Sequence, residues 1–161
     1  MSADIQIALP NAEATTALGA RIAPLLQAGD AVLLYGPLGM GKSTLARGLI
    51  RALTRPDEDV PSPTFTLVQF YEPRNPAKGP PVAHFDLYRL TRPEEAFEIG
   101  LDEALEEGAV LIEWPERLGD DVSWIAGTNL LCITLSEDGA GRVATVSVAG
   151  TWEARRDDIT G

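Results

Sequence analysis

Apolar residues follow two different spacings along this chain. The unbroken apolar runs 31–35 and 109–112 are typical of strands buried on both faces of a parallel sheet. In segments 12–26 and 43–53 the apolar residues recur every three or four positions, which predicts helices with one buried face. Pro24 should kink or shorten the first of these helices near its end. Strands therefore alternate with helices in this half of the chain.

The other segments extend the same pattern. Segments 142–149 and 129–135 alternate in polarity around Glu137-Asp138-Gly139, which indicates an antiparallel hairpin. The tail from Thr151 is polar apart from Trp152, and the proline-rich segments should be irregular. We predict an α/β fold, with a mostly parallel sheet flanked by helices and a C-terminal antiparallel hairpin. The further predicted strands are 4–9, 65–71 and 82–87, the short helices are 93–98 and 101–107, and the irregular segments are 54–64 and 72–81.

Length and composition limit the class of protein. The 161 residues, 45% of them apolar, predict a single domain over 1–161 that buries a core without disulfides. Cys132 is the one cysteine in the sequence, and it falls in a predicted strand, so we expect a core residue in a reducing compartment. The sequence shows neither a secretory leader nor an apolar run of membrane-spanning length. We therefore expect a cytoplasmic protein without a membrane partner.

The charge balance bears on partners. Thirteen basic residues against 24 acidic ones give a net charge of −11. A domain that grips nucleic-acid phosphates is usually basic, so any contact with RNA should be indirect, through a partner protein, and none is expected with DNA. The acidity either keeps the protein soluble or matches a charged partner, and the sequence leaves both open.

The segment 36–43, Gly-Pro-Leu-Gly-Met-Gly-Lys-Ser, matches the phosphate-loop pattern G-x-x-x-x-G-K-[ST]. An apolar strand precedes it and a predicted helix follows, as this loop requires. Backbone N–H groups of the loop would cradle phosphates, Lys42 would reach the β- and γ-phosphates, and the Ser43 hydroxyl would bind Mg²⁺. Thr44 either caps the helix or touches nucleotide. The alternative is a glycine-rich turn with an exposed lysine and no bound nucleotide. The loop residues expected at the nucleotide are Gly36, Leu38, Gly39, Met40 and Gly41.

Two acids follow apolar strands and are candidates for catalysis and for Mg²⁺. Asp86 closes one strand and Glu113 another, and ligands bind outside the carboxyl ends of strands in open α/β sheets. The sequence does not divide Mg²⁺ binding from water activation between them, and either could be a solvated surface acid. Thr64, in a Pro-Ser-Pro-Thr segment, is the candidate threonine that senses the γ-phosphate, or else a structural hydroxyl of a rigid turn.

Three other features refine the hypothesis. His84 lies within an apolar strand and should be packed and neutral. Trp114 follows Glu113 and is expected at the core or rim rather than stacked on a base. The sequence contains no Asn-Lys-x-Asp motif that would favour guanine, so ATP is the default nucleotide.

Taken together, the motifs resemble one family. The phosphate loop, Pro-Ser-Pro-Thr-Phe-Thr-Leu-Val at 61–68, His-Phe-Asp-Leu-Tyr-Arg-Leu at 84–90 and Ile-Glu-Trp-Pro-Glu at 112–116 are similar to the bacterial TsaE (YjeE) ATPases. The resemblance runs from about Ile5 to Leu118. It implies a small phosphate-loop ATPase that hydrolyses ATP with Mg²⁺ and assists the TsaD–TsaB transferase pair in threonylcarbamoyladenosine modification of tRNA adenosine 37.

The resemblance also implies residue roles. Lys42 and Ser43 would hold phosphate and Mg²⁺, Thr64 would be the switch threonine, and Asp86 and Glu113 the essential acids, with Glu113 near Mg²⁺. Trp114 would lie close to the nucleotide, and the adenine near Asn11 and Ala12. Two residues depart from the family pattern, because Pro37 stands where Asp is common and Ser43 where Thr is common.

Two other functions remain open at this stage. A small kinase would transfer the γ-phosphate of ATP to an acceptor and would need lid arginines, for which Arg89 and Arg92 are the nearby pair. A nucleotide-gated adaptor would bind ATP without catalysis, and would keep its function when Glu113 is replaced by glutamine.

Overall fold

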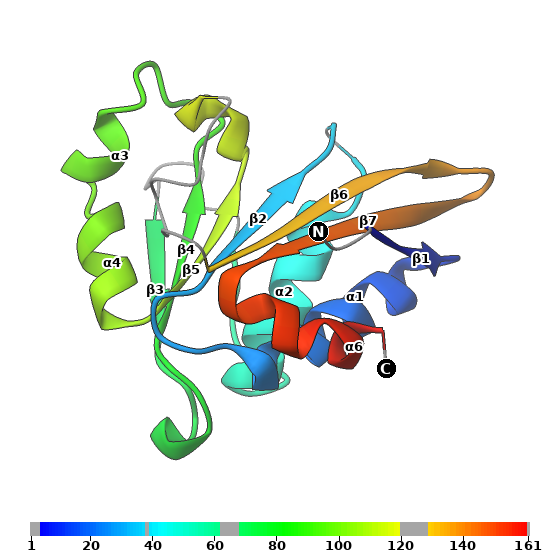
Figure 1. Cartoon of the computed structure of the whole chain (residues 1–161), viewed down its shortest axis with the longest axis horizontal. Helices are drawn as coiled ribbons and strands as arrows, with labels where there is room; N and C mark the ends of the chain where they lie inside the picture. The colour runs from blue at the N-terminus through cyan, green and yellow to red at the C-terminus, as the bar shows by residue number, and fades with distance from the viewer. Residues whose placement is uncertain (1–3, 38, 62–67, 120–128, 161) are drawn as a thin grey trace.

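The computed structural model describes residues 4–37, 39–61, 68–119 and 129–160, and these residues form one layered α/β structure around a seven-stranded sheet (Figure 1). The strand order across the sheet is β1-β7-β6-β2-β5-β4-β3. The strands are β1 (Ile5–Leu9), β2 (Ala31–Tyr35), β3 (Val68–Tyr71), β4 (Val82–Asp86), β5 (Ala109–Glu113), β6 (Leu130–Asp138) and β7 (Gly141–Ala149).

The sheet is parallel in its centre and antiparallel at its two sides. Strand β2 pairs in parallel with both β5 and β6, and β4 pairs in parallel with β5. The antiparallel pairs are β6 with β7, β7 with β1, and β3 with β4. The predicted α/β class, with helices flanking the sheet and a C-terminal antiparallel hairpin, is confirmed, and the parallel part of the sheet is its centre. The hairpin strands are longer than predicted, since pairing continues to Asp138 opposite Gly141.

Helices cover both faces of the sheet, and alternate residues of β2 show why. Val32 and Leu34 belong to the core under α1 (Ala12–Ile22) and α2 (Lys42–Leu53). Ala31 and Leu33 belong to the core under α3 (Glu95–Glu98) and α4 (Leu101–Glu107). A strand buried on both faces has no polar alternation, which is the pattern that the sequence shows.

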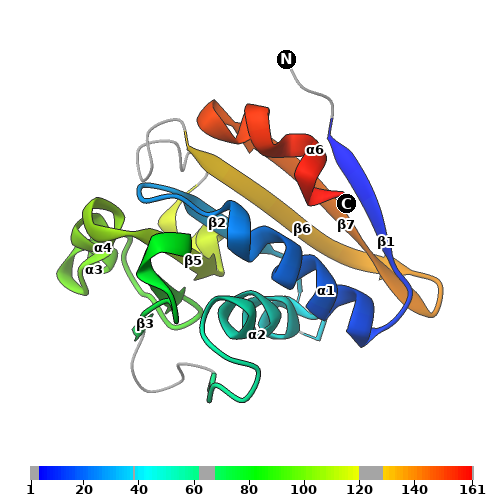
Figure 2. The same ribbon diagram turned by 90° about the horizontal axis from the view of Figure 1, so that it is seen from below.

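Helices α1 and α2 run side by side at very close range (Figure 2). Gly19 and Gly48 form the contact, and a Cβ atom at either position would collide with backbone of the other helix, at Leu45 and Thr16 respectively. This crossing fixes α2, and therefore the loop before it, against the first helix.

The C-terminal tail packs onto the α1–α2 side of the molecule. It forms a 3-10 helix, η4 (Gly150–Arg155), and then α6 (Arg156–Ile159). Trp152 and Ile159 are fully buried in the core beneath α1 and α2. The polar composition of this segment gave no sign of helices, because its buried side chains are only Trp152, Ile159 and the charged Arg155.

Smaller departures from the predicted elements have local causes. Helix α1 ends at Ile22 and continues as a 3-10 turn, η1 (Ala23–Leu25), since Pro24 has no N–H to donate. The predicted strand 65–71 is described from Val68, and its first three residues lie outside the described part. The irregular segment 72–81 contains the 3-10 turn η2 (Pro76–Lys78). No helix in the described ranges is long and apolar enough to cross a membrane.

Candidate functional site

The glycine-rich loop joins β2 to α2, where the sequence predicted it. Gly39 and Gly41 adopt positive φ angles of 82° and 102°, which L side chains rarely adopt. Gly41 is the N-cap of α2, so the helix begins at Lys42 with its free N–H groups directed toward the loop. The loop thus has the backbone of an anion-binding turn at a helix N-terminus.

Lys42 lies buried against the loop and an aromatic ring. Its Nζ donates to the carbonyl oxygen of Gly36 at 2.5 Å and lies 3.4 Å from the centre of the Trp114 ring. Burial lowers the pKa of Lys42, while the nearby carboxylates of Glu113, Glu116 and Asp86 act in the opposite direction. The alternative of a turn with an exposed lysine is excluded, since Lys42 is 5% exposed.

Glu113, at the end of β5, is held by two side chains. Its Oε1 accepts from the Ser43 hydroxyl at 3.1 Å, and its Oε2 lies 2.7 Å from Nε2 of His84. Glu113 and His84 are 3% and 2% exposed, so neither is a solvated surface group. A buried carboxylate with both oxygens bonded is fixed in one orientation. His84 is packed, as predicted, but its contact with Glu113 was missed.

Asp86 lies beside Glu113 on the neighbouring strand. The two residues are register partners at the carboxyl ends of β4 and β5. Asp86 Oδ1 accepts from the backbone N–H of Tyr88 at 3.1 Å. Burial raises the pKa of Asp86, the Tyr88 bond opposes this, and the charge of Glu113 adds to the rise. The sheet thus brings both predicted acids to the phosphate loop, as strand-end acids in adjacent parallel strands should be.

Trp114 is placed at the rim of this cluster. It has a φ of 60°, a left-handed conformation that is rare for a bulky residue. Its ring lies between Lys42 and Tyr88, with 4.9 Å between the Trp114 and Tyr88 ring centres. Arg117 lies 5.6 Å from the Tyr88 ring on the outside. The rim position was predicted, and the contact with the loop lysine was not.

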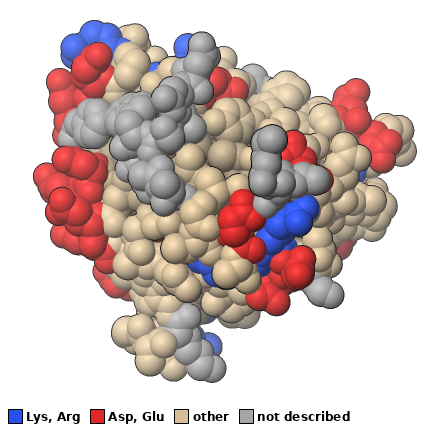
Figure 3. Space-filling model, viewed as in Figure 1, with Lys and Arg blue, Asp and Glu red and all other residues tan. Residues whose placement is uncertain are grey.

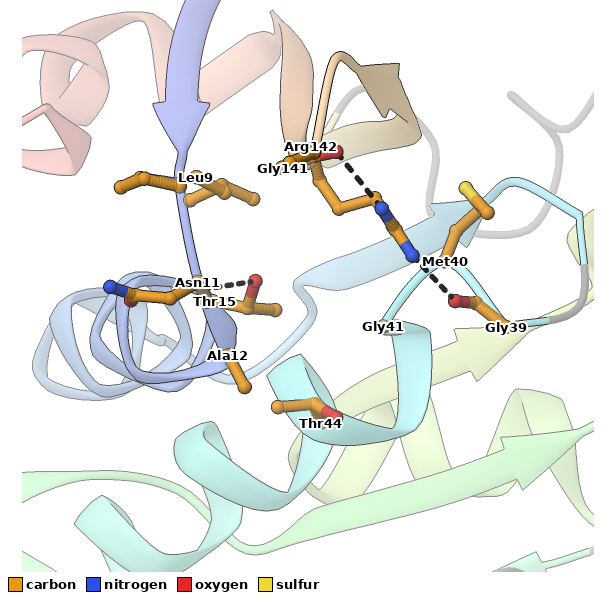
Figure 4. A pocket seen from close by; sticks show the side chains of 12 residues that line it. Leu9, Asn11, Ala12, Thr15, Gly39, Met40, Gly41, Thr44, Gly141 and Arg142 are labelled. Carbon is orange, nitrogen blue, oxygen red and sulfur yellow. Dashed lines mark hydrogen bonds between the residues drawn. The ribbon is translucent and has the colours of Figure 1, made fainter.

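A pocket of about 240 Å³ opens on the other side of the loop (Figure 4). Its walls come from the start of α1, the loop and the β6–β7 turn. Asn11 caps α1 through its Oδ1, which accepts from Ala14 N at 2.9 Å. The predicted residues that line the pocket are Asn11, Ala12, Gly39, Met40, Gly41 and Thr44.

Sequence reasoning missed the walls that come from the hairpin. Arg142 at the start of β7 donates to the carbonyl oxygens of Gly141 and Gly39, at 2.9 and 3.4 Å, and so links the hairpin to the phosphate loop. Thr15 of α1 also lines the pocket. Only the sheet order brings residue 142 beside residue 39, so no local signal could have found it.

Two predicted site residues, Leu38 and Thr64, lie outside the described residues. Cys132, predicted to lie in the core, is half-buried against the α3–α4 side of the sheet. Burial raises the pKa of its thiol to about 11.

The donor set suits a hard cation that is shared with phosphates. Ser43, Glu113 and Asp86 offer hydroxyl and carboxylate oxygens, which are the ligands that Mg²⁺ prefers. Within the described ranges, no group of three or more His, Cys, Asp or Glu residues is arranged to hold a metal ion.

A parallel sheet with a glycine-rich loop between β2 and α2, and with acids on the adjacent strand ends, defines a phosphate-loop NTPase fold. The solved structure of Bacillus subtilis YdiB has this fold, with a TM-score of 0.74 over 99% of this chain and 96% of that one, at 24% sequence identity. The family model described as "Threonylcarbamoyl adenosine biosynthesis protein TsaE" matches residues 9–143. The chain belongs to the TsaE family, and so to a family of tRNA threonylcarbamoyladenosine biosynthesis.

Individual relatives agree with this assignment. The Mycobacterium tuberculosis protein named "tRNA threonylcarbamoyladenosine biosynthesis protein TsaE" is 40% identical over 121 residues, which cover 71% of each chain. The Rickettsia felis protein of the same name is 42% identical over 108 residues, which cover 67% of this chain and 61% of that one. The resemblance found in the sequence motifs is thereby confirmed.

Proposed function

We propose that this protein is a Mg²⁺-dependent ATPase that serves tRNA threonylcarbamoyladenosine synthesis together with the TsaD–TsaB transferase pair. The observation that carries the proposal is the cluster of Lys42, Ser43, Glu113 and Asp86 at the phosphate loop. These residues come from three different elements and are linked by hydrogen bonds or strand register. Membership of the TsaE family supports the pathway.

The loop and the helix start would bind the triphosphate. Backbone N–H groups of residues 39–43 would donate to the phosphate oxygens, and Lys42 would exchange its bond to Gly36 for one to the β- and γ-phosphates. The Ser43 hydroxyl would hold Mg²⁺ with Glu113 and Asp86. When bound there, the ion would neutralise charge that develops on the γ-phosphate.

The acids would place the attacking water. Glu113 is held from two sides, so its carboxylate keeps one direction while the nucleotide binds. Asp86 is less buried and lies beside it, which suits a group that exchanges between water and ion. His84 would act as a positioning residue for Glu113. Thr64 is retained as the proposed switch threonine.

The pocket beside the loop would take the nucleoside part of ATP. Asn11 and Ala12 begin α1 on one side of it, and Met40 and Thr44 lie on the loop side. Trp114 lies on the opposite side of the loop, next to Lys42, so it would line the phosphate end rather than stack on the base.

The partners would be proteins rather than RNA. The net charge of −11 disfavours direct grip on tRNA phosphates, which leaves the tRNA contact to the transferase pair. Work on tRNA would place the protein in the cytoplasm. The kinase alternative gains no support, since Arg92 already pairs with Glu95 and Glu98 at 3.8 and 3.7 Å.

The decisive measurement is ATP hydrolysis by the protein alone and with TsaD–TsaB and tRNA. We expect activity that rises with the partners, and that falls about 100-fold in Lys42→Ala and in Glu113→Gln. Glu103→Gln is the matched control, because this exposed glutamate of α4 makes the same change of charge away from the loop. Hydrolysis that persists in Glu113→Gln would contradict the assigned site, and unchanged activity with no complex would contradict the partners.

A further inference from the structure

Basic side chains gather along one face of α2, in a part of the chain that contains no acid. Between Asp30 and Asp57 the sequence has neither aspartate nor glutamate. Arg47 and Arg51 are four residues apart and so lie one turn apart on the same face of α2, and Arg55 follows just beyond the end of the helix. Like charges at this spacing repel, which makes the row a cost to the helix unless something outside the helix uses it.

Many of the acidic residues of the protein lie away from Arg47 and Arg51. Figure 3 shows them over α3 and α4, whose sequence contributes Glu95, Glu98, Asp102 and Glu103. Helix α2 lies against the other face of the sheet, beside α1 (Figure 2). The protein is therefore strongly acidic as a whole but carries a separate basic row.

The arginines line a continuous depression. One pocket of about 810 Å³ and another of about 350 Å³ share Ala20, Arg51, Ala52 and Pro56. A third, of about 490 Å³, shares Thr54, Arg55, Pro56 and Arg74 with the first. It is also lined by Asp57, Glu58 and Glu72, so the basic part of the depression is the part beside Arg47, Arg51 and Arg74. We name this surface the arginine furrow, and define it by Arg47, Arg51, Arg55, Arg74 and the apolar residues between them.

Three of the four furrow arginines form no ion pair among the described residues. Among the ion pairs of the described residues, Arg55 contacts Asp57 and Glu58 at 3.5 and 3.8 Å, and none includes Arg47, Arg51 or Arg74. Arg51 uses its Nε to donate to the backbone oxygen of Glu58 at 3.0 Å, which leaves its two Nη groups for another acceptor. A guanidinium row of this kind fits carboxylates.

The floor of the furrow favours a protein over a nucleic acid. Its apolar lining is aliphatic, from alanines, Leu53 and prolines such as Pro24, Pro56 and Pro76. No Phe, Tyr or Trp is among the described residues that line it, so it offers no ring on which an RNA base could stack. Shallow aliphatic pockets beside a row of arginines fit leucine-like side chains and carboxylates on one segment.

We propose that the arginine furrow is a docking surface for an acidic, amphipathic segment of a partner protein. Carboxylates at four-residue spacing on a helix would meet Arg47 and Arg51, since both rows advance about 6 Å per step. Apolar residues beside them would enter the pockets. Thr44 lines both the furrow and the nucleotide pocket, so the docked segment would end beside the bound nucleotide. The proposal goes beyond the ATPase function and does not require hydrolysis.

The test is a fluorescence anisotropy titration with a labelled synthetic helical peptide that carries Glu at i, i+4 and i+8 and Leu on the adjoining face. We expect saturable binding that weakens about tenfold in Arg47→Gln/Arg51→Gln and more mildly in Arg74→Gln. Arg89→Gln/Arg92→Gln removes the same charge outside the furrow and should bind as the unchanged protein does. Binding should also fall as salt rises from about 50 to about 300 mM.

Further variants separate loss of contact from loss of fold. Arg47→Lys/Arg51→Lys keeps the charge and should retain most of the binding. The glutamine pair should melt close to the unchanged protein, because the removed repulsion along α2 offsets the lost Arg51–Glu58 hydrogen bond. Equal binding by the glutamine pair, equal binding of a Glu-to-Gln peptide, or no saturable binding would overturn the proposal. A single-stranded RNA that binds the furrow while the peptide does not would overturn the choice of partner.

Discussion

At the residue scale, the site depends on how a buried carboxylate is compensated. An unpaired buried charge is costly, so Glu113 at 3% exposure needs partners. Ser43 and His84 supply one contact for each oxygen. The same contacts that make the burial tolerable also fix the carboxylate beside the loop, so stability and position have one cause.

Asp86 should lower the stability of the folded protein at neutral pH. Burial raises its pKa above the ordinary 3.8, so between 3.8 and the raised pKa the folded protein binds more protons than the unfolded chain. Stability therefore falls as pH rises through this range and is constant above it. We therefore expect Asp86→Asn to raise the free energy of unfolding at pH 7, with the gain shrinking to zero near about pH 4. Urea unfolding across this range measures it.

Exposed Asp138→Asn is the control and should change stability by less than about 0.5 kcal/mol at every pH. If Asp86→Asn were less stable than the unchanged protein at pH 7, contacts to the ionised carboxylate would be shown to stabilise the fold.

At the element scale, two glycines set the distance between α1 and α2. Alanine is preferred to glycine inside a helix by about 1 kcal/mol, so by propensity alone Gly48→Ala should stabilise α2. The structure predicts the opposite, because the new Cβ would meet the backbone of Thr16. We expect a loss of about 2 kcal/mol or more, as for overpacked cores, seen as a lower melting temperature.

Ala52 is exposed on the same helix, so Ala52→Gly measures the effect of helix propensity alone on the free energy of unfolding. We expect a loss of about 1 kcal/mol. If Gly48→Ala proved as stable as the unchanged protein, the close crossing of the two helices would be wrong.

The β6–β7 hairpin is the other element with a consequence for the site. The hairpin lies within the sheet between β2 and β1, and Gly141 and Arg142 at the start of β7 form a wall of the nucleotide pocket. We expect Arg142→Ala to weaken nucleotide binding about tenfold, through loss of its contact with the loop, with little change in the rate of hydrolysis at saturation. Titration calorimetry with ADP, with Arg92→Ala as the control away from the pocket, measures it.

If Arg142→Ala bound ADP as tightly as the unchanged protein, the hairpin would have a structural role in the sheet and none in nucleotide binding. A lower rate at saturating ATP, without a change in affinity, would point instead to a role at the phosphates.

At the scale of the whole molecule, a buried ion pair joins Arg155 of the C-terminal tail to Asp30 in the turn before β2. Arg155 donates to Asp30 through both Nη atoms, at 2.7 and 3.1 Å, and to the carbonyl oxygen of Leu25 at 2.7 Å. Its guanidinium also lies 3.8 Å from the centre of the Trp152 ring. Residues far apart in the sequence thus meet at the base of the strand that leads to the phosphate loop.

Removal of one partner should be far more costly than removal of an exposed pair. We expect Arg155→Leu to lose about 3 to 5 kcal/mol of stability, because Asp30 would remain buried and charged. Asp30→Asn/Arg155→Leu should recover part of this loss. Arg92→Gln, which breaks exposed pairs, should cost less than about 1 kcal/mol. Losses that are additive in the double variant would contradict direct coupling of the pair.

The sequence by itself determined the parts of this protein that depend on short-range patterns. Apolar runs predicted β2 and β5, helical spacing predicted α1 and α2, and the loop chemistry of residues 36–43 needs glycines, a lysine and a hydroxyl in a fixed order. Strand-end acids were predictable as well, because parallel strands place their carboxyl ends at one edge.

Only the tertiary structure decided which distant residues meet. The strand order brings Arg142 to the loop, the β4–β5 register brings His84 to Glu113, and the tail brings Arg155 to Asp30. Trp114 is placed on Lys42 by a backbone turn that its own side chain does not favour. Such contacts join segments that are far apart along the chain, so their energies depend on the packing of the whole sheet rather than on any local preference.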